Sequence, residues 1–515
     1  MSGGSASYLQ LGASSEHGAA VNQTEELPAN PQSESWCAWV VKQVPEELLA
    51  AENGSLRLLF AGKAIRMFSF GFLAVMLFTY LSALHFAPTS IGLLFTVTLI
   101  GDASISLYLT SNADVMGRRK MLLIGAALSV ATSFVFALSS SYWVLLIAAT
   151  LGVISPAGSE VGPFMAIELS CISQLTRQET RTSIMAWYNL TSSFANAAGA
   201  AVCGFLLTAL TSLVSSEISS FRIVMLVYAL LQCAKLLCFL RLNSEIEVPE
   251  GTLAKTKASP VALFMGLHKS KNIVLQLCCL FTLDSFAGSF VMQSIVSHWF
   301  HVKFNTPAAT IGAMLFFCNL VAGVSALLAA RIANYIGLIL TMVVTHLPSN
   351  VFTILVAVMP TQATAMLLLF CRFSISQMDV PTRNAYVNGV VDPDERSAAN
   401  GLTNVTRSVG AAFGPLCAGL LFAKYGGSCP YPFFICGVLK IVYDLLLLYN
   451  MQSVKPDSEK TPAESGSGGA QDGVDVQVVT FTALDDRQRT EKADPDQDDD
   501  QEEMKENDDN DVVEL

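Results

Sequence analysis

The sequence predicts an all-α membrane protein in which twelve transmembrane helices form two parallel six-helix bundles. Three observations support this fold class. The 515 residues are 52% hydrophobic and only 14% charged, whereas a soluble chain of this size is normally about one quarter charged. Apolar runs of about 20 residues recur along the chain, and this length matches a bilayer core at helical rise. Finally, the first half of the runs resembles the second half in sequence.

The apolar runs divide the chain into twelve expected spans. Helix is expected for each span, because backbone groups without hydrogen bonds are too costly in lipid. A soluble fold would have to bury twelve helices that have almost no polar face. The expected spans cover residues 68–86, 91–111, 121–139, 143–165, 186–211, 222–241, 272–299, 309–330, 338–359, 363–382, 400–423 and 431–449.

The segments around the spans complete the predicted domain organisation. Residues 1–63 form a polar N-terminal region, largely disordered, with an interfacial helix expected near 36–50 and no cleaved signal. The two bundles are expected at 64–241 and 272–450, joined by a cytoplasmic linker at 242–271.

The C-terminal tail, residues 451–515, accounts for the acidity of the chain. It carries 20 Asp and Glu against 6 Lys and Arg, while the whole chain has a formal net charge of −12. A segment with this much like charge and this little apolar content is expected to be disordered. We interpret it as a solvated spacer or, alternatively, as a docking segment for a cytoplasmic protein partner.

The sequence lacks motifs for cofactors, metals and enzymatic chemistry. The twelve cysteines have no CxxC spacing, so neither a zinc site nor a disulfide framework is expected. Because GxSxG, HExxH and GxxxxGK[ST] motifs are also missing, we predict no enzyme and no ATP-driven pump. We also predict no cofactor and no nucleic-acid partner. His298 and His301 lack a third ligand, so we predict no metal site.

Basic residues are concentrated in alternate loops. The loops after spans two, four, six, eight and ten hold most of them, including Arg118, Arg119 and Lys120 after span two. Loops rich in Lys and Arg face the cytoplasm, so both termini are expected there. Either the plasma membrane or an organelle membrane fits this pattern.

Several motifs recur at a nearly constant offset between the two halves. Gly92 pairs with Gly312, and Gly117 pairs with Gly337, each 220 residues later. The stretch RTSIMAWYNLTSSFANAAGAAVCG pairs with RSAANGLTNVTRSVGAAFGPLCAG at an offset of 215. Each repeat holds six spans, and an even number returns the chain to the same side. The halves are therefore parallel repeats, an architecture that suits alternating access around a site near the middle of the membrane.

The stretch TSNADVMGRRKML resembles the signature of the major facilitator superfamily. Asp114, Gly117 and Arg118 match that signature with the basic residues that follow, while Thr110 and Val115 depart from it. With the twelve spans and the repeat, the resemblance covers both expected bundles and implies a membrane transporter. Motifs typical of its drug antiporters and sugar porters are incomplete or absent, so no subfamily is assigned.

In that family the signature forms a latch that closes the cytoplasmic side. The resemblance implies that Asp114 contacts the start of span eleven near residues 399–403. It also implies that Arg118 pairs with an acid at the cytoplasmic end of span four, for which Glu168 is the better candidate by depth. The expected gating latch comprises Asp114, Gly117, Arg118, Arg119 and Glu168. Alternatively, Glu168 is an ordinary interfacial acid.

Ionisable residues inside the spans are the candidates for a substrate or proton site, because such residues are costly in lipid and usually face a cavity or a partner. The candidates are Glu160, Asp284, Arg372, Asp102 and Asp379. Glu160 is alternatively a structural ion pair. The resemblance implies that spans one, four, seven and ten line the central path. A carboxylate beside a mobile arginine meets the physical requirement for proton coupling.

Two further interpretations concern packing. Small residues in spans five and eleven are expected to let helices approach closely; these are Gly199, Gly204, Gly414, Pro415 and Gly419. Lys440 and Asp444 are expected to form an i,i+4 pair within span twelve, and His346 is expected to be a satisfied core residue.

The leading functional hypothesis is a secondary active transporter of a small solute that works by alternating access with proton coupling. An uncoupled facilitator is the first alternative. A non-transporting sensor or scaffold with the same fold is the second. The lipid bilayer, a small-molecule substrate and protons are the partners that this hypothesis requires.

Overall fold

The computed structural model describes residues 54–152, 154–156, 163–247, 267–392 and 395–452, together with residues 454 and 456. Every regular element in this part of the chain is a helix. The first half contains α3 (Gly54–Ala83), α4 (Pro88–Met116), α5 (Arg118–Leu138), α6 (Tyr142–Leu151), α7 (Pro163–Leu175), α8 (Gln178–Leu213), α9 (Glu217–Leu240) and η2 (Ser244–Ile246). The second half contains α11 (Lys271–Ser289), α12 (Gln293–Phe304), α13 (Ala308–Ile336), α14 (Leu338–Val358), α15 (Gln362–Ser376), α16 (Asp379–Val390), α17 (Arg396–Tyr425) and α18 (Tyr431–Met451). The expected interfacial helix near 36–50, most of the linker and nearly all of the tail lie outside the described residues.

The helices have the length and composition that a membrane requires. Among the described residues, eleven helices or pairs of consecutive helices are long and apolar enough to cross a bilayer. The shorter α6 and α7 take the place of the fourth expected span. Large apolar side chains such as Leu138, Phe205 and Leu213 are exposed, as expected of a surface that faces lipid. The prediction of an all-α membrane protein is confirmed.

Three of the expected spans are interrupted. The fourth is divided between α6 and α7, the seventh between α11 and α12, and the tenth between α15 and α16. Non-helical backbone at membrane depth is tolerated only where it is buried in protein or lines a cavity. The interruptions therefore indicate where the interior site of the protein lies.

The sequence repeat is also present in the backbone. Gly117 separates α4 from α5 with φ at +102°, and Gly337 separates α13 from α14 with φ at +84°. Residues with a Cβ atom rarely adopt these angles, whereas glycine adopts them readily. Glycine at both equivalent positions thus allows the same tight turn in each half.

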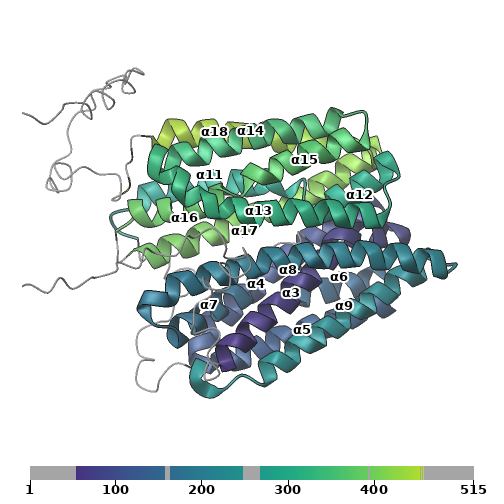
Figure 1. Cartoon of the computed structure of the whole chain (residues 1–515), viewed down its shortest axis with the longest axis horizontal. Helices are drawn as coiled ribbons and strands as arrows, with labels where there is room; N and C mark the ends of the chain where they lie inside the picture. Colours follow the sequence, from purple (N-terminus) through teal and green to yellow (C-terminus); the bar gives the residue numbers. More distant parts are fainter. Residues whose placement is uncertain are drawn as a thin grey trace, which may run out of the picture. The chain divides into compact units, whose positions relative to one another are not determined.

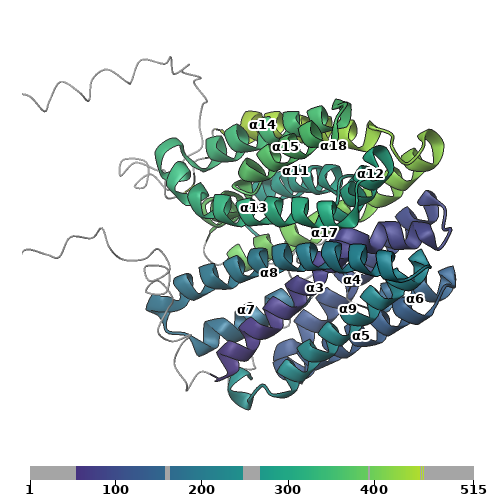
Figure 2. The ribbon, with the colours of Figure 1, turned by 45° about the vertical axis from the view of Figure 1, so that its right-hand side comes forward.

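The two halves meet at two close helix crossings that the repeat relates to each other. α8 lies beside α13 in both views (Figures 1 and 2), and α4 packs against α17. A Cβ atom on Gly204 would lie 2.4 Å from the carbonyl oxygen of Ala308, and one on Gly419 would lie 2.4 Å from that of Pro88. Only glycine permits backbones to approach this closely.

The two ends of the bundles differ in how the halves meet. We call the end with the loops between α4 and α5, α7 and α8, and α16 and α17 the basic end, and the opposite end the far end. Four hydrogen bonds join described residues of the two halves, and all four lie at mid-depth or toward the far end. Ser297 Oγ donates to the carbonyl oxygen of Ala74 at 2.7 Å, and His298 Nδ1 lies 3.4 Å from Thr79 Oγ1. Among the described residues, these hydrogen bonds thus join the halves from mid-depth to the far end.

Candidate functional site

A network of charged side chains fills the interior of the second half. Asp284 of α11 is its centre. The Lys440 ammonium of α18 donates to Asp284 Oδ1 at 2.6 Å, and Arg383 Nη1 of α16 lies 3.6 Å from Asp284 Oδ2. His346 Nε2 lies 3.9 Å from the same carboxylate. All four side chains are buried, and the cations around Asp284 offset the cost of placing a carboxylate in the interior.

The other two carboxylates of this network also have partners. Arg383 Nη1 donates to Asp379 Oδ2 at 2.8 Å within α16. Asp444 Oδ1 lies 2.7 Å from His346 Nδ1, and Asp444 Oδ2 accepts a hydrogen bond from Asn350 at 2.8 Å. His346 is therefore a hydrogen-bonded core residue, as predicted.

The predicted i,i+4 pair between Lys440 and Asp444 is wrong. Lys440 bonds across the bundle to Asp284, and Asp444 bonds across it to α14. Facing helices offer buried partners with opposite charge or with donor groups, and the low polarity of the interior makes such contacts stronger than a pair along one helix surface. Sequence spacing does not reveal which facing helix supplies the partner.

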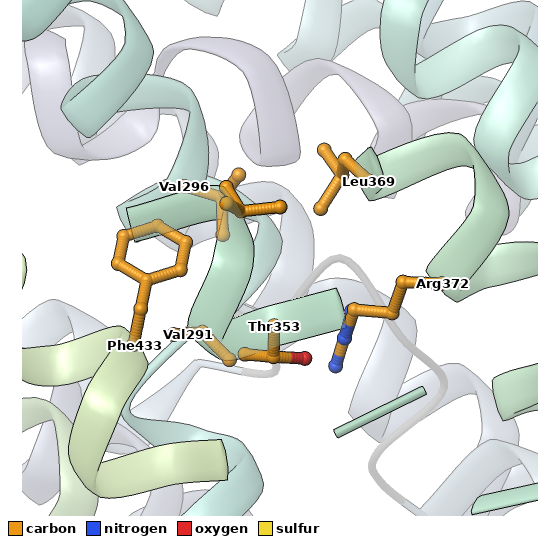
Figure 3. Close-up of a pocket in the computed structure, with 7 residues that line it drawn as sticks. Val291, Val296, Thr353, Leu369, Arg372 and Phe433 are labelled. Carbon is orange, nitrogen blue, oxygen red and sulfur yellow. The ribbon is translucent and has the colours of Figure 1, made fainter. Parts of the chain in front are cut away.

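Arg372 of α15 points into a narrow cavity inside the second half (Figure 3). The space between these side chains is too narrow to hold a water molecule, and its lining is apolar apart from Thr353 and Arg372 itself. Val291, in the interruption between α11 and α12, forms part of one wall. Arg372 Nε has no hydrogen-bond partner among the described residues. Its guanidinium lies beside the ring of Phe373, 5.1 Å from the centroid.

The first half contains a second buried cluster, centred on Glu168 of α7. Arg66 of α3 donates two hydrogen bonds to Glu168, at 2.7 and 2.6 Å, and the hydroxyl of Tyr188 donates a third. The ammonium groups of Lys63 and Lys235 lie over the rings of Tyr188 and Phe164, 4.2 and 4.4 Å from the centroids. Both oxygens of Glu168 are thus occupied by donors from α3 and α8.

The expected partner of Glu168 was Arg118, and the structure pairs both residues differently. Arg118 donates to Asp114 Oδ1 at 2.8 Å and to Gln174 Oε1 at 2.7 Å. Asp114 is therefore bonded across the turn between α4 and α5 rather than to the start of α17. The physical reason is depth: Glu168 is fully buried beside Arg66, while Asp114 and Gln174 lie with Arg118 at the basic end.

The turn between α4 and α5 is held by Glu247, a carboxylate that the sequence analysis did not single out. Glu247 accepts hydrogen bonds from the backbone N–H groups of Arg118 and Arg119, at 2.7 and 3.1 Å. These are unpaired N–H groups of the first turn of α5, where a negative charge is favourable. The carboxylate also leaves little room at Gly117, where a Cβ atom would lie 3.3 Å from Glu247 Oε1.

Asp102 of α4 differs from every carboxylate above. It is buried, and neither of its oxygens has a hydrogen-bond partner among the described residues. The neighbouring Gly101 packs against α6, since a Cβ atom there would lie 2.3 Å from the carbonyl oxygen of Thr150. Asp102 is thus next to the point where the fourth span is interrupted. Glu160, the candidate within that interruption, lies outside the described residues.

The small residues expected to permit close packing lie at helix contacts. A Cβ atom on Gly199 would lie 1.9 Å from the carbonyl oxygen of Phe68, and one on Gly414 would lie 1.8 Å from Ser289 Oγ. The carbonyl oxygen of Pro415 approaches Gly92 across the contact between α17 and α4, 2.4 Å from where a Cβ atom would be. In the described part of the chain, no group of three or more His, Cys, Asp or Glu side chains is arranged to hold a metal ion.

Three comparisons place this arrangement among known proteins. The sequence profile described as Major Facilitator Superfamily matches residues 59–378 and 351–489. An uncharacterized membrane protein of Saccharomyces cerevisiae is 27% identical over 418 residues, which are 76% of this chain and 93% of the yeast protein.

Two solved structures show the same fold. The nucleoside transporter NupG, solved as a point mutant, aligns with a TM-score of 0.60 at 14% identity, over 77% of this chain and 99% of its own. A D-xylose–proton symporter aligns with a TM-score of 0.60 at 11% identity, over 80% and 99%.

Proposed function

Because this chain belongs to the major facilitator superfamily and is a membrane transporter rather than an enzyme, we propose that it moves a small solute by alternating access with protons as the coupling ion. In this mechanism one six-helix bundle moves against the other around a central site. The interruptions in spans four, seven and ten supply backbone at mid-membrane depth that is able to change conformation.

The packing of the two halves supports alternating access. Their close contacts, including Gly204 with Ala308 and Ser297 with Ala74, lie toward the far end. Since loops rich in Lys and Arg face the cytoplasm, the basic end and both termini are cytoplasmic in this proposal. The arrangement then corresponds to a state closed to the outside. The opposite state requires these contacts to separate.

Asp102 is the carboxylate that best supports proton coupling, and the observation that carries the proposal is that neither of its oxygens has a hydrogen-bond partner among the described residues. An unpaired carboxylate in an apolar interior avoids the cost of its charge by taking up a proton. Asp284 is less suited to this role, because Lys440 and Arg383 stabilise its charge. We propose that Asp102 carries the coupled proton. It releases this proton when α4 moves against α6 and water reaches the carboxylate.

A proteoliposome experiment tests this function. The purified protein is reconstituted with a pH-sensitive dye inside, and pools of sugars, amino acids, organic acids and organic cations are added under an imposed proton gradient. Proton entry that depends on a pool, and that Asp102→Asn abolishes, is the expected result. Solute uptake that persists without proton movement would favour an uncoupled facilitator. Failure of every pool to cross would favour a sensor or scaffold.

A further inference from the structure

Inside the second half, cations outnumber carboxylates among the described residues. This excess of positive charge indicates which charge a bound solute would carry. The described membrane-embedded part of this half contains four permanent cations, Lys440, Arg372, Arg383 and Arg407, against three carboxylates. Each carboxylate is already bonded: Asp284 to Lys440, Asp379 to Arg383, and Asp444 to His346 and Asn350. The two remaining cations, Arg372 and Arg407, have no carboxylate partner among the described residues.

Arg407 is the less available of these two arginines. Its Nε donates to Ser285 Oγ at 3.2 Å, next to Asp284 on α11. The hydroxyl leaves the positive charge uncompensated, but it fixes the side chain between α17 and α11. Sequence reasoning missed Arg407, since its own helix contains no acid to indicate a charged interior.

Arg372 is the more available arginine. Its side chain extends into the cavity, toward Thr353 and Val291 (Figure 3). The remaining walls come from Val296, Val356, Leu369 and Phe433. A guanidinium in such apolar surroundings is costly without a counter-charge. Its planar group of donors suits a carboxylate or a phosphate, which it binds through two parallel hydrogen bonds.

We propose that the transported solute is a small organic anion with an apolar body, and that its acid group binds to Arg372. This inference rests on the proposed transport function and specifies its substrate class. The apolar walls accommodate the body of the solute, while the arginine fixes its charged end. The free space is narrow in this state, so the solute enters as the interruption between α11 and α12 rearranges. Thr353, the polar residue beside Arg372, already donates its hydroxyl proton to the carbonyl oxygen of Ser349 at 3.0 Å, so Arg372 is the donor that the acid group meets.

Matched ligands test the charge requirement directly. Thermal unfolding of the purified protein is measured with benzoate, benzamide and benzylammonium, which share one body and carry charges of −1, 0 and +1. A wider panel of aliphatic carboxylates, organic phosphates and sulfonates is added, each with a neutral analogue. Ligands that bind the folded state raise its stability. Stabilisation by anions but not by their neutral or cationic analogues is expected.

Variants of Arg372 then locate the binding. Arg372→Gln is expected to weaken anion binding by about 30-fold or more, because a buried charge then lacks its partner. Arg372→Lys retains the charge without the two parallel donors and is expected to bind with intermediate affinity. Arg331→Gln, at an exposed arginine of the same half, is expected to bind like the wild type.

The outcomes separate this inference from the proposed function. Proton-coupled transport of a neutral or cationic solute would overturn the anion assignment and leave the transport proposal intact. Anion binding that survives in Arg372→Gln would overturn the site. If no solute binds or crosses the membrane in any arm, the transport proposal fails and this inference fails with it.

Discussion

Glu168 of α7 and Arg383 of α16 occupy equivalent positions in the two halves, 215 residues apart, and carry opposite charges. Glu168 pairs with Arg66 on the first span, and Arg383 lies 3.6 Å from Asp284 on the seventh. The same pair of helices is therefore bridged in each half with the acid and the base exchanged. In each case the bridge ties one segment of an interrupted span to a neighbouring helix.

Breaking the bridge in the first half is expected to be strongly destabilising. Arg66→Leu or Glu168→Leu leaves one charge buried without its partner, at a cost of about 3–5 kcal/mol. Exchanging the charges, with Arg66→Glu and Glu168→Arg together, is expected to recover part of that loss. Thermal unfolding midpoints of the purified variants measure the effect. Single variants as stable as the wild type would show that the pair contributes little.

A larger side chain at the crossing of α8 and α13 is expected to shift the equilibrium from the state closed at the far end to the state open there. In Gly204→Leu the side chain cannot fit against the backbone of Ala308, so the far end should remain open more of the time. Probes at residues 215 and 360, in far-end loops of the two halves, would report a longer mean distance by energy transfer. Gly54, a partly buried residue with open space around its Cα, provides a control as Gly54→Leu. An unchanged distance in Gly204→Leu would argue against closure at this crossing.

The loop before α17 is expected to lose stability in acid. Burial raises the pKa of Glu395, but the backbone N–H groups of His268, Lys269 and Ser270 donate to its carboxylate and lower the pKa to about 2. A lowered pKa in the folded state gives stability that is present above about pH 4.5 and is lost as the pH falls toward 2.

The variant Glu395→Gln isolates this contribution. It is expected to be less stable than the wild type at neutral pH, and the difference between the two should shrink between pH 4.5 and pH 2. Unfolding midpoints measured across this range provide the test. A constant difference would mean that the negative charge of Glu395 does not strengthen its hydrogen bonds to residues 268–270, which lead into α11.

The sequence predicted the helices well because hydropathy and length decide membrane spans locally. It missed details that depend on tertiary partners. The first span was expected from residue 68, whereas α3 begins at Gly54, because Lys63 and Arg66 reduce the hydropathy of a segment that is nonetheless buried. That error concealed Arg66 as the partner of Glu168. The turns at Gly117 and Gly337 were recoverable, since the repeat marks both.

The most direct test of the central claim compares two kinds of transport in Asp102→Asn proteoliposomes. Accumulation of solute driven by a proton gradient requires the proton site, whereas exchange of labelled for unlabelled solute at equal pH requires only the movement of the two halves. The variant is expected to lose accumulation and to retain exchange. Accumulation at the wild-type level in Asp102→Asn would contradict the assignment of the proton to this residue.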